Sequence, residues 1–227
     1  MKALQFALKG NWAHFRKPET NNNPLSHDFI TKTALIGLIG AVIGKERKEM
    51  KPLFPQLSTD LKYTVKINNA VQKQSWGFTF RGVSDAYKQA PKQMEVIRNP
   101  DYLITLGLFN TNSNEIFEEF KLFLQQSIAK YTPILGLHNC PAELQFITAG
   151  ELVAAKGNFE TDGFISNNHK AKSFSRLGFE KMPTFQNDDF WNLPDKYEKI
   201  IYPSESKTIE AEGDFFVFNN VSNWYLI

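Results

Sequence analysis

The stretch that decides the fold is GNWAHFRKPETNNNPLSHDFITKTALIGLIGAVIG, residues 10–44. It begins with an aromatic and basic segment that ends a predicted strand, continues through a polar loop, and ends in an apolar helix. Gly37, Gly40, Ala41 and Gly44 recur three or four residues apart, so they share one face of that helix. Glycine lowers helix propensity, and several glycines therefore need a structural reason. We expect this face to lie close against a sheet while the helix supports a loop that contacts a flat, anionic ligand.

The limits of this helix follow from its end residues. Either Thr31 or Thr33 can cap its start, and Gly44 supplies a left-handed stop. Pro52 and Pro55 predict that no helix continues beyond it. If the glycine face packs on a sheet, a leucine in place of Gly37 should unfold the domain. The buried face is predicted to consist of Leu35, Leu38, Ile39, Val42 and Ile43.

The composition is that of a folded, soluble protein. The chain has 227 residues, of which 42% are hydrophobic and 22% are charged, so a disordered chain is excluded. Cys140 is the single cysteine, which rules out an intramolecular disulfide and fits a reducing cytoplasm. The longest apolar run, residues 34–44, is shorter than the roughly 20 residues of a membrane span, and no secretory signal is visible. We therefore expect a cytoplasmic protein without a membrane anchor.

The charge is distributed unevenly along the chain. Residues 1–100 hold 16 Lys and Arg against 7 Asp and Glu, a net charge of +9, whereas residues 101–227 hold 10 against 17, a net charge of −7. Aromatic residues lie among the basic ones in the first half, a mixture that suits stacking on unpaired bases and neutralisation of phosphates. The first half therefore predicts a basic, nucleic-acid-binding face. The alternative is that both halves simply mix on the surface.

The order of elements predicts an α+β fold. Alternation or continuous apolarity predicts strands, and 3.6-residue periodicity predicts a second helix after Asn112, ending near Tyr131. Asn112 and Glu115 have the spacing of a capping box. The order β-α-β-β-α-β is that of a ferredoxin-like (RRM-like) domain, which many unrelated proteins share. The four strands are expected at residues 3–9, 61–67, 102–109 and 144–148.

Two further segments have a distinct character. Residues 71–98 mix aromatic and basic side chains without helical periodicity and are predicted to form a protruding hairpin inside the domain. We place the ferredoxin-like domain at residues 1–150 and a β-rich, acidic part at residues 151–227. The latter contains a polar stretch around Trp191 and ends in a predicted hairpin that turns near Asn219.

Three motifs resemble one protein family. The opening stretch is similar to the N-terminal signature of the Cas-five family. Members of this family are RAMP-type CRISPR-associated proteins of type I surveillance complexes (Cascade). The version of the signature looks most like subtype I-B, and Ile30 departs from it because many relatives have a proline there. The segments TPILGLHNCPAEL and VIRNPDYLI resemble the loop before the last core strand and the exit from the family's thumb. The matching residues are Gly10, Ala13, Phe15, Arg16, Ser26, Phe29, Lys32, Thr33, Leu35, Gly37, Leu38, Gly44, Arg98, Pro100, Tyr102, Pro133, Leu135 and Gly136.

The resemblance implies a role in antiviral defence. Such proteins cap the 5′ handle of the CRISPR guide RNA with a ferredoxin-like body. Their hairpin thumb, here residues 71–98, reaches the neighbouring backbone subunit where handle meets guide. The large subunit docks nearby, and target DNA is contacted only indirectly. No cofactor is implied.

Candidate RNA-binding residues fall in four groups. Arg16 is expected to contact phosphate, whereas Lys17 serves equally well as a solvated surface charge. Lys32 and Thr33 lie at a helix N-terminus, which binds anions through free amides or is simply capped. The loop at Gly136 offers backbone amides, or is an ordinary tight turn. Lys73, Trp76 and Arg81 in the hairpin serve either RNA or the adjacent protein subunit. The full set is Trp12, His14, Phe15, Arg16, Lys17, Lys32, Thr33, Lys73, Trp76, Arg81, Arg98, Gly136, His138 and Asn139.

Other chemistries have weaker support. The four histidines lack the spacing of zinc ligands, and neither a phosphate-binding P-loop nor a nucleophile elbow is present. One alternative is a metal-independent endoribonuclease that processes the CRISPR RNA precursor with a converging His, Tyr and Lys. His14, His27, Tyr63 and His138 are available for it. A third possibility is a scaffold whose basic arm meets an acidic protein.

Overall fold

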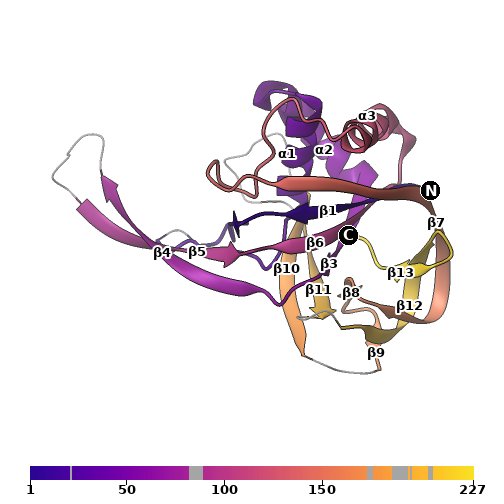
Figure 1. Ribbon diagram of the computed structural model, residues 1–227. Helices are drawn as coiled ribbons and strands as arrows, with labels where there is room; N and C mark the ends of the chain where they lie inside the picture. The colour runs from indigo at the N-terminus through magenta and orange to yellow at the C-terminus, as the bar shows by residue number, and fades with distance from the viewer. Residues whose placement is uncertain (21, 82–88, 173–175, 186–193, 195, 204–206) are drawn as a thin grey trace.

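The computed structural model describes the chain except for residues 21, 82–88, 173–175, 186–193, 195 and 204–206. Its body is a mixed α/β structure in which three α-helices cover one face of a curled antiparallel sheet (Figure 1). Two smaller three-stranded sheets adjoin this body, with the orders β10-β11-β8 and β2-β5-β4. Trp191 and the polar stretch around it lie largely outside the described residues.

The main sheet has the strand order β13-β12-β7-β1-β6-β3, and β9 pairs with β12. The neighbours pair antiparallel throughout. β6 lies between β1 and β3 in this sheet and is largely buried, as its continuous apolar sequence predicts. The strands of this sheet are β1 (Lys2–Lys9), β3 (Leu61–Ile67), β6 (Asp101–Leu108), β7 (Glu143–Thr161), β9 (Lys170–Ala171), β12 (Ile209–Phe218) and β13 (Ser222–Trp224).

β7 is much longer than the predicted strand at residues 144–148. Its first half pairs with β1 and its second half with β12, so the strand curls from the body into the C-terminal part. Residue 150, where the sequence predicts a domain boundary, lies inside this strand. The division into two domains stays a prediction.

The hairpin predicted at residues 71–98 is present. β4 (Gln72–Arg81) and β5 (Gln89–Arg98) pair in continuous antiparallel register and project away from the body in Figure 1. β2 (Trp12–Ala13) pairs with the end of β5, so the chain that leaves β1 joins the base of the hairpin.

The smaller C-terminal sheet packs into the same core as the body. β10 (Leu177–Phe185), β11 (Lys196–Pro203) and β8 (Ile165–Ser166) are antiparallel. Tyr202 of β11 lies edge-to-face on Phe29 at a ring-centroid distance of 4.9 Å. This contact anchors the C-terminal sheet to the loop that precedes the first helix.

The structure confirms the predicted ends and the predicted buried face of the first helix. α1 (Lys32–Ile43) begins at the cap Thr31, whose hydroxyl accepts a hydrogen bond from the Ala34 amide. Gly44 ends it with a left-handed φ of 79°. All five residues of the predicted apolar face are buried.

The predicted packing of the glycine face was wrong. A Cβ at Gly40 would contact Met50 of α2, and one at Gly44 would contact Lys130, whereas Gly37 is exposed with nothing within 4 Å of such a Cβ. The face therefore lies toward the second helix and solvent, because the apolar residues occupy the side next to the sheet. A leucine at Gly37 has no sheet to displace, and the expected unfolding does not follow.

The prolines do not stop a second helix. α2 (Arg47–Asp60) contains both Pro52 and Pro55, although each proline removes a helical N–H donor. A capping box formed by Glu46 and Glu49 starts the helix, and Met50, Phe54 and Leu57 are buried in the core. This burial and capping outweigh the local cost of the prolines.

The third helix starts and ends differently from the prediction. A 3₁₀ turn (Thr111–Ser113) precedes α3 (Asn114–Gln125), and the Asn112 amide bonds to the Asn110 side chain, so the predicted capping box is absent from this described segment. The helix stops before Tyr131 because Ser127 turns left-handed at φ 55°. The amides of Lys130 and Tyr131 then bond to the carbonyls of Val42 and Ala41, at the end of α1. The bond from Lys130 supplies a donor to the Val42 carbonyl in the last turn of α1, where carbonyls lack intrahelical partners.

Candidate nucleic-acid interface

The aromatic-basic strand exit and the hairpin share one structural unit. Trp12 pairs with Arg98 across β2 and β5, and its ring lies 5.0 Å from that of Trp76, in an edge-to-face arrangement. The Glu95 amide also bonds to the Pro24 carbonyl, which ties the polar loop to the hairpin. Residues 12–17 and the hairpin base therefore lie on the same side of the molecule.

A cleft of about 510 Å³ opens beside this unit. It brings together the strand exit, the start of α1, the base of the hairpin and the loop at Gly136. Predicted RNA-binding residues of the strand exit, the start of α1 and the Gly136 loop thus line one cavity, to which the hairpin contributes Met94. Its lining residues are His14, Phe15, Arg16, Pro18, Pro24, Thr31, Thr33, Ala34, Met94, Gly136, Leu137, Pro183 and Pro194.

The N-terminus of α1 supplies backbone donors to this cleft. Thr31 caps the Ala34 amide, whereas helix geometry leaves the amides of Lys32 and Thr33 without intrahelical acceptors. Such amides and the helix dipole favour an anion. Thr33 lines the cleft, so a phosphate there is within reach of this helix end.

Lys32 cannot act as a surface cation. It is only 5% exposed. Burial, and to a lesser extent the positive charge of Lys62, lower the pKa of Lys32 to about 7, while the negative charge of Glu198 partly opposes this shift. The folded protein loses this proton in a pH range where the unfolded chain retains it. Burial of Lys32 therefore costs stability, and this cost is largest below the folded pKa.

We expect Lys32→Met to stabilise the fold in a pH-dependent way. Stability of the native protein should rise between pH 7 and 10.5, as the unfolded state binds the extra proton across that interval. The variant lacks this cost and should gain about 2 kcal/mol in unfolding free energy at pH 6, with little gain near pH 10. Urea titrations at both pH values measure it. Lys170→Met, at an exposed position in β9, is the control, and an equal gain at both pH values would contradict the explanation.

Gly136 fixes the loop against the strand exit. Its φ is +91°, and a Cβ there would lie 1.9 Å from the carbonyl oxygen of His14. The His14 amide donates to the Leu135 carbonyl, and the Leu135 amide donates to the Cys140 carbonyl. The glycine thus allows the close approach that forms one wall of the cleft. His138 and Asn139 are exposed on the same loop.

His14 itself is almost fully buried. Its Nδ1 lies 2.6 Å from the carbonyl oxygen of Glu95, and its exposed fraction is 5%. Burial lowers the pKa of His14, the bond to Glu95 opposes this, and the charge of Arg16 adds to the lowering. The imidazole is therefore neutral at pH 7.

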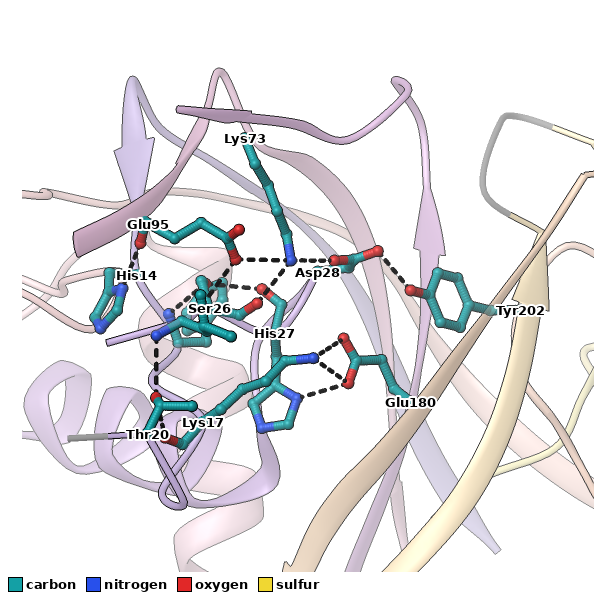
Figure 2. A network of polar contacts seen from close by, with 12 residues as sticks. His14, Lys17, Thr20, Ser26, His27, Asp28, Lys73, Glu95, Glu180 and Tyr202 are labelled. Carbon is teal, nitrogen blue, oxygen red and sulfur yellow. Dashed lines mark hydrogen bonds and ion pairs between the residues drawn. The ribbon is translucent and has the colours of Figure 1, made fainter. Parts of the chain in front are cut away.

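Lys73 is the centre of a polar network at the base of the hairpin (Figure 2). Its Nζ donates to Asp28 at 2.7 Å, to Glu95 at 3.0 Å and to the Ser26 carbonyl at 2.7 Å. Asp28 also accepts from the Tyr202 hydroxyl at 2.5 Å. Burial alone would lower the pKa of Lys73, but the two carboxylates raise it above its usual value. The network joins the polar loop, the hairpin and β11.

A second pair of contacts holds Lys17. Its Nζ lies 3.0 Å from Glu180 of β10, and the same carboxylate contacts His27 Nδ1 at 3.1 Å. Burial would raise the pKa of Glu180, but its bonds to His27 and Lys17 lower it overall. The Lys17 ammonium group is therefore paired with a carboxylate of β10, and it would have to leave this ion pair to bind a phosphate.

The remaining candidates divide by exposure. Phe15 is 2% exposed and belongs to the core, so it cannot stack on a base. Arg16 is exposed, and its guanidinium donates to the Thr20 carbonyl at 3.1 Å. Arg98 is exposed at the hairpin base. The side chain of Arg81 lies outside the described residues.

Sequence reasoning missed the acidic half of the interface. Asp28, Glu95 and Glu180 hold two of the predicted basic residues, yet they are separated by up to 152 positions in the chain. No spacing or periodicity links them. Only the tertiary structure reveals these pairs.

Neither a metal-binding cluster nor a membrane-spanning helix is found in the part of the chain that the structure describes. It contains no cluster of three or more His, Cys, Asp or Glu residues arranged to hold a metal ion. None of its helices combines the length and apolarity needed to traverse a bilayer.

Comparison with known proteins gives a family and a fold. The family model described as CRISPR-associated protein (Cas_Cas5) matches residues 3–190. A CRISPR protein from Archaeoglobus fulgidus has a similar crystal structure, with a TM-score of 0.61, 11% identity, and 96% of each chain covered. A chain of a CRISPR RNA-guided surveillance complex is similar with a TM-score of 0.51 and 12% identity, over 97% of this chain and 92% of the other. No curated protein sequence matches the chain. At these identities the two structures establish similarity of fold alone.

Proposed function

The chain belongs to the Cas-five (Cas5) family of CRISPR-associated proteins, and from this premise we propose that it is a non-catalytic RNA-binding subunit of a type I surveillance complex (Cascade). The observation that supports this most is the single cleft that gathers the strand exit, the α1 N-terminus and the Gly136 loop. Backbone amides and Arg16 at one cavity suit a sugar–phosphate backbone.

The proposed ligand is the 5′ handle of the CRISPR guide RNA. The cleft adjoins the base of the β4–β5 hairpin, which extends away from the body as a thumb would. In this arrangement the body caps the handle, the hairpin reaches the backbone subunit, and the large subunit docks nearby. Target DNA is contacted only through the complex. Assignment to subtype I-B and to the cytoplasm is part of the proposal.

We also infer that the body is a ferredoxin-like domain. The strands β1, β3, β6 and β7 occupy the sheet in the order β7-β1-β6-β3, with α1 between the first pair in sequence and α3 between the last. This is the arrangement expected for a β-α-β-β-α-β unit. α2 and the β4–β5 hairpin are then insertions.

The endoribonuclease alternative requires an available tyrosine and histidine. Tyr63 is fully buried and donates its hydroxyl to the Ile30 carbonyl at 2.9 Å, while His27 is buried against Glu180. These engagements favour the non-catalytic role. Incubation of the protein with repeat RNA in EDTA distinguishes the two, since site-specific cleavage that His14→Ala or His138→Ala abolishes would support the enzyme.

The proposal is tested by RNA binding and its salt dependence. The tagged protein, expressed beside its CRISPR locus, should co-purify with guide RNA and other Cas subunits. In vitro, Arg16→Ala should weaken binding and reduce the slope of log Kobs against log salt by about 1. Lys156→Ala, at an 81% exposed site on the β7–β12 pair, should leave the slope unchanged. Absence of RNA from the purified complex would overturn the function, and an unchanged slope would remove Arg16 from the interface.

A further inference from the structure

The imidazole of His14 is fixed in one tautomer. Its Nδ1 lies 2.6 Å from the backbone carbonyl oxygen of Glu95. A carbonyl oxygen only accepts hydrogen bonds, so Nδ1 carries the hydrogen. In the neutral ring the second nitrogen, Nε2, then has a lone pair and no hydrogen. It can accept a hydrogen bond but cannot donate one.

The residue that carries this acceptor is one of those that line the cleft. His14 lines the cavity together with Thr33 and Gly136. In Figure 2 the imidazole points its second nitrogen away from Glu95 and from the network around Lys73. Nε2 has no partner among the residues that the structure describes. Nε2 of His27 also has no partner among these residues, but that atom is fully buried.

The chemistry of Nε2 restricts what it can bind. Phosphate oxygens are acceptors, so they suit the α1 amides and Arg16 but are repelled by a lone pair. The donors of RNA are the ribose 2′-hydroxyl and the N–H groups of bases. A 2′-hydroxyl lies beside every phosphate, whatever the base sequence. A phosphate held at the start of α1 therefore brings a 2′-hydroxyl into the same cavity.

We infer that Nε2 of His14 accepts a hydrogen bond from a ribose 2′-hydroxyl, so that the cleft selects RNA over DNA. The inference rests on the RNA-binding function proposed above. His14 is in this view a specificity-determining residue held in place by the hairpin, since its positioning bond comes from β5.

The test compares sugars at constant sequence. The full chain is titrated with a fluorescent, mixed-sequence single strand of about 12 nucleotides, made as RNA, as 2′-fluoro RNA and as DNA. The 2′-fluoro sugar keeps the RNA-like pucker but cannot donate a hydrogen bond. The wild-type protein should bind RNA about tenfold more tightly than 2′-fluoro RNA, the effect of one lost hydrogen bond at a desolvated site.

Two substitutions separate the acceptor from the positioning bond. The amide nitrogen of His14→Asn can still donate to the Glu95 carbonyl, but the variant has nothing at the position of Nε2. Its RNA affinity should fall to within about twofold of its 2′-fluoro RNA affinity. His14→Gln places an amide oxygen near the Nε2 position and should retain part of the preference. Melting curves confirm that each variant is folded.

Each outcome decides the inference. Equal binding of RNA and 2′-fluoro RNA by the wild-type protein would overturn it, as would a folded His14→Asn variant with the full preference. If the wild-type protein binds no RNA, the proposed function fails as well, whereas binding without a 2′-hydroxyl preference removes only the role of His14.

Discussion

Alanine in place of Gly136 is expected to destabilise the protein by about 4 kcal/mol and to abolish tight RNA binding. The positive φ of +91° costs an alanine roughly 1–3 kcal/mol. In addition, the new Cβ would lie 1.9 Å from the His14 carbonyl oxygen, so the backbone must move. Overpacking of this kind costs roughly 1–3 kcal/mol more. Because the strand exit would move with it, the cleft would lose its shape.

Urea denaturation and RNA titration measure both effects. Gly77→Ala is the matched control, since a Cβ at Gly77 of β4 meets nothing within 4 Å and its φ is not in the left-handed region. The control should change the unfolding free energy by less than about 1 kcal/mol. A Gly136→Ala variant as stable as this control would show that the loop does not depend on the close approach.

Removal of the Lys73 charge should be the next most damaging change. In Lys73→Met, Asp28 and Glu95 lose the cation that bonds to both, and their side chains are only 22% and 28% exposed. Partly buried carboxylates without a counter-charge are costly, and we expect a loss of about 2–3 kcal/mol in unfolding free energy. The hairpin base should loosen, and RNA affinity should fall with it.

A double-mutant cycle shows whether the loss comes from the carboxylates. Asp28→Asn in the Lys73→Met background should recover part of the stability, which gives a coupling energy above about 1 kcal/mol. Lys92→Met is the control on the same hairpin, because the contact of Lys92 within the described residues is a hydrogen bond to the neutral Asn22 side chain. Additive single losses would mean that Lys73 acts through its packing rather than its charge.

Local patterns predicted those features that depend on neighbouring residues. The strand Leu61–Ile67, the left-handed stop at Gly44 and the turn at Asn219 and Asn220 agree with the structure. Each depends on alternation or on the φ that glycine or asparagine tolerates. Local patterns failed at α2, where burial of Met50 and Phe54 overrides two prolines.

The candidate site was predicted only in part. The resemblance to the family and the aromatic-basic exit led to the residues that line the cleft. The same reasoning assigned Lys17, Lys32 and Phe15 to the RNA surface, yet the first is paired with Glu180 and the other two are buried. Composition shows how many basic residues a segment has, but it does not show which carboxylate lies beside each of them in the folded protein.

The sequence by itself determined the strands at Lys2–Lys9, Leu61–Ile67 and Asp101–Leu108, the β4–β5 hairpin, the capped helix α1 and the family, since these depend on residue type at short range. The tertiary structure alone decided which lysines are buried or paired with a carboxylate. It also decided where the glycine face of α1 points. The tautomer of His14 also belongs to this second group, since it is set by a carbonyl 81 residues away. The physical reason is that burial and charge pairing depend on contacts between distant segments, which exist only once the sheet has brought those segments together.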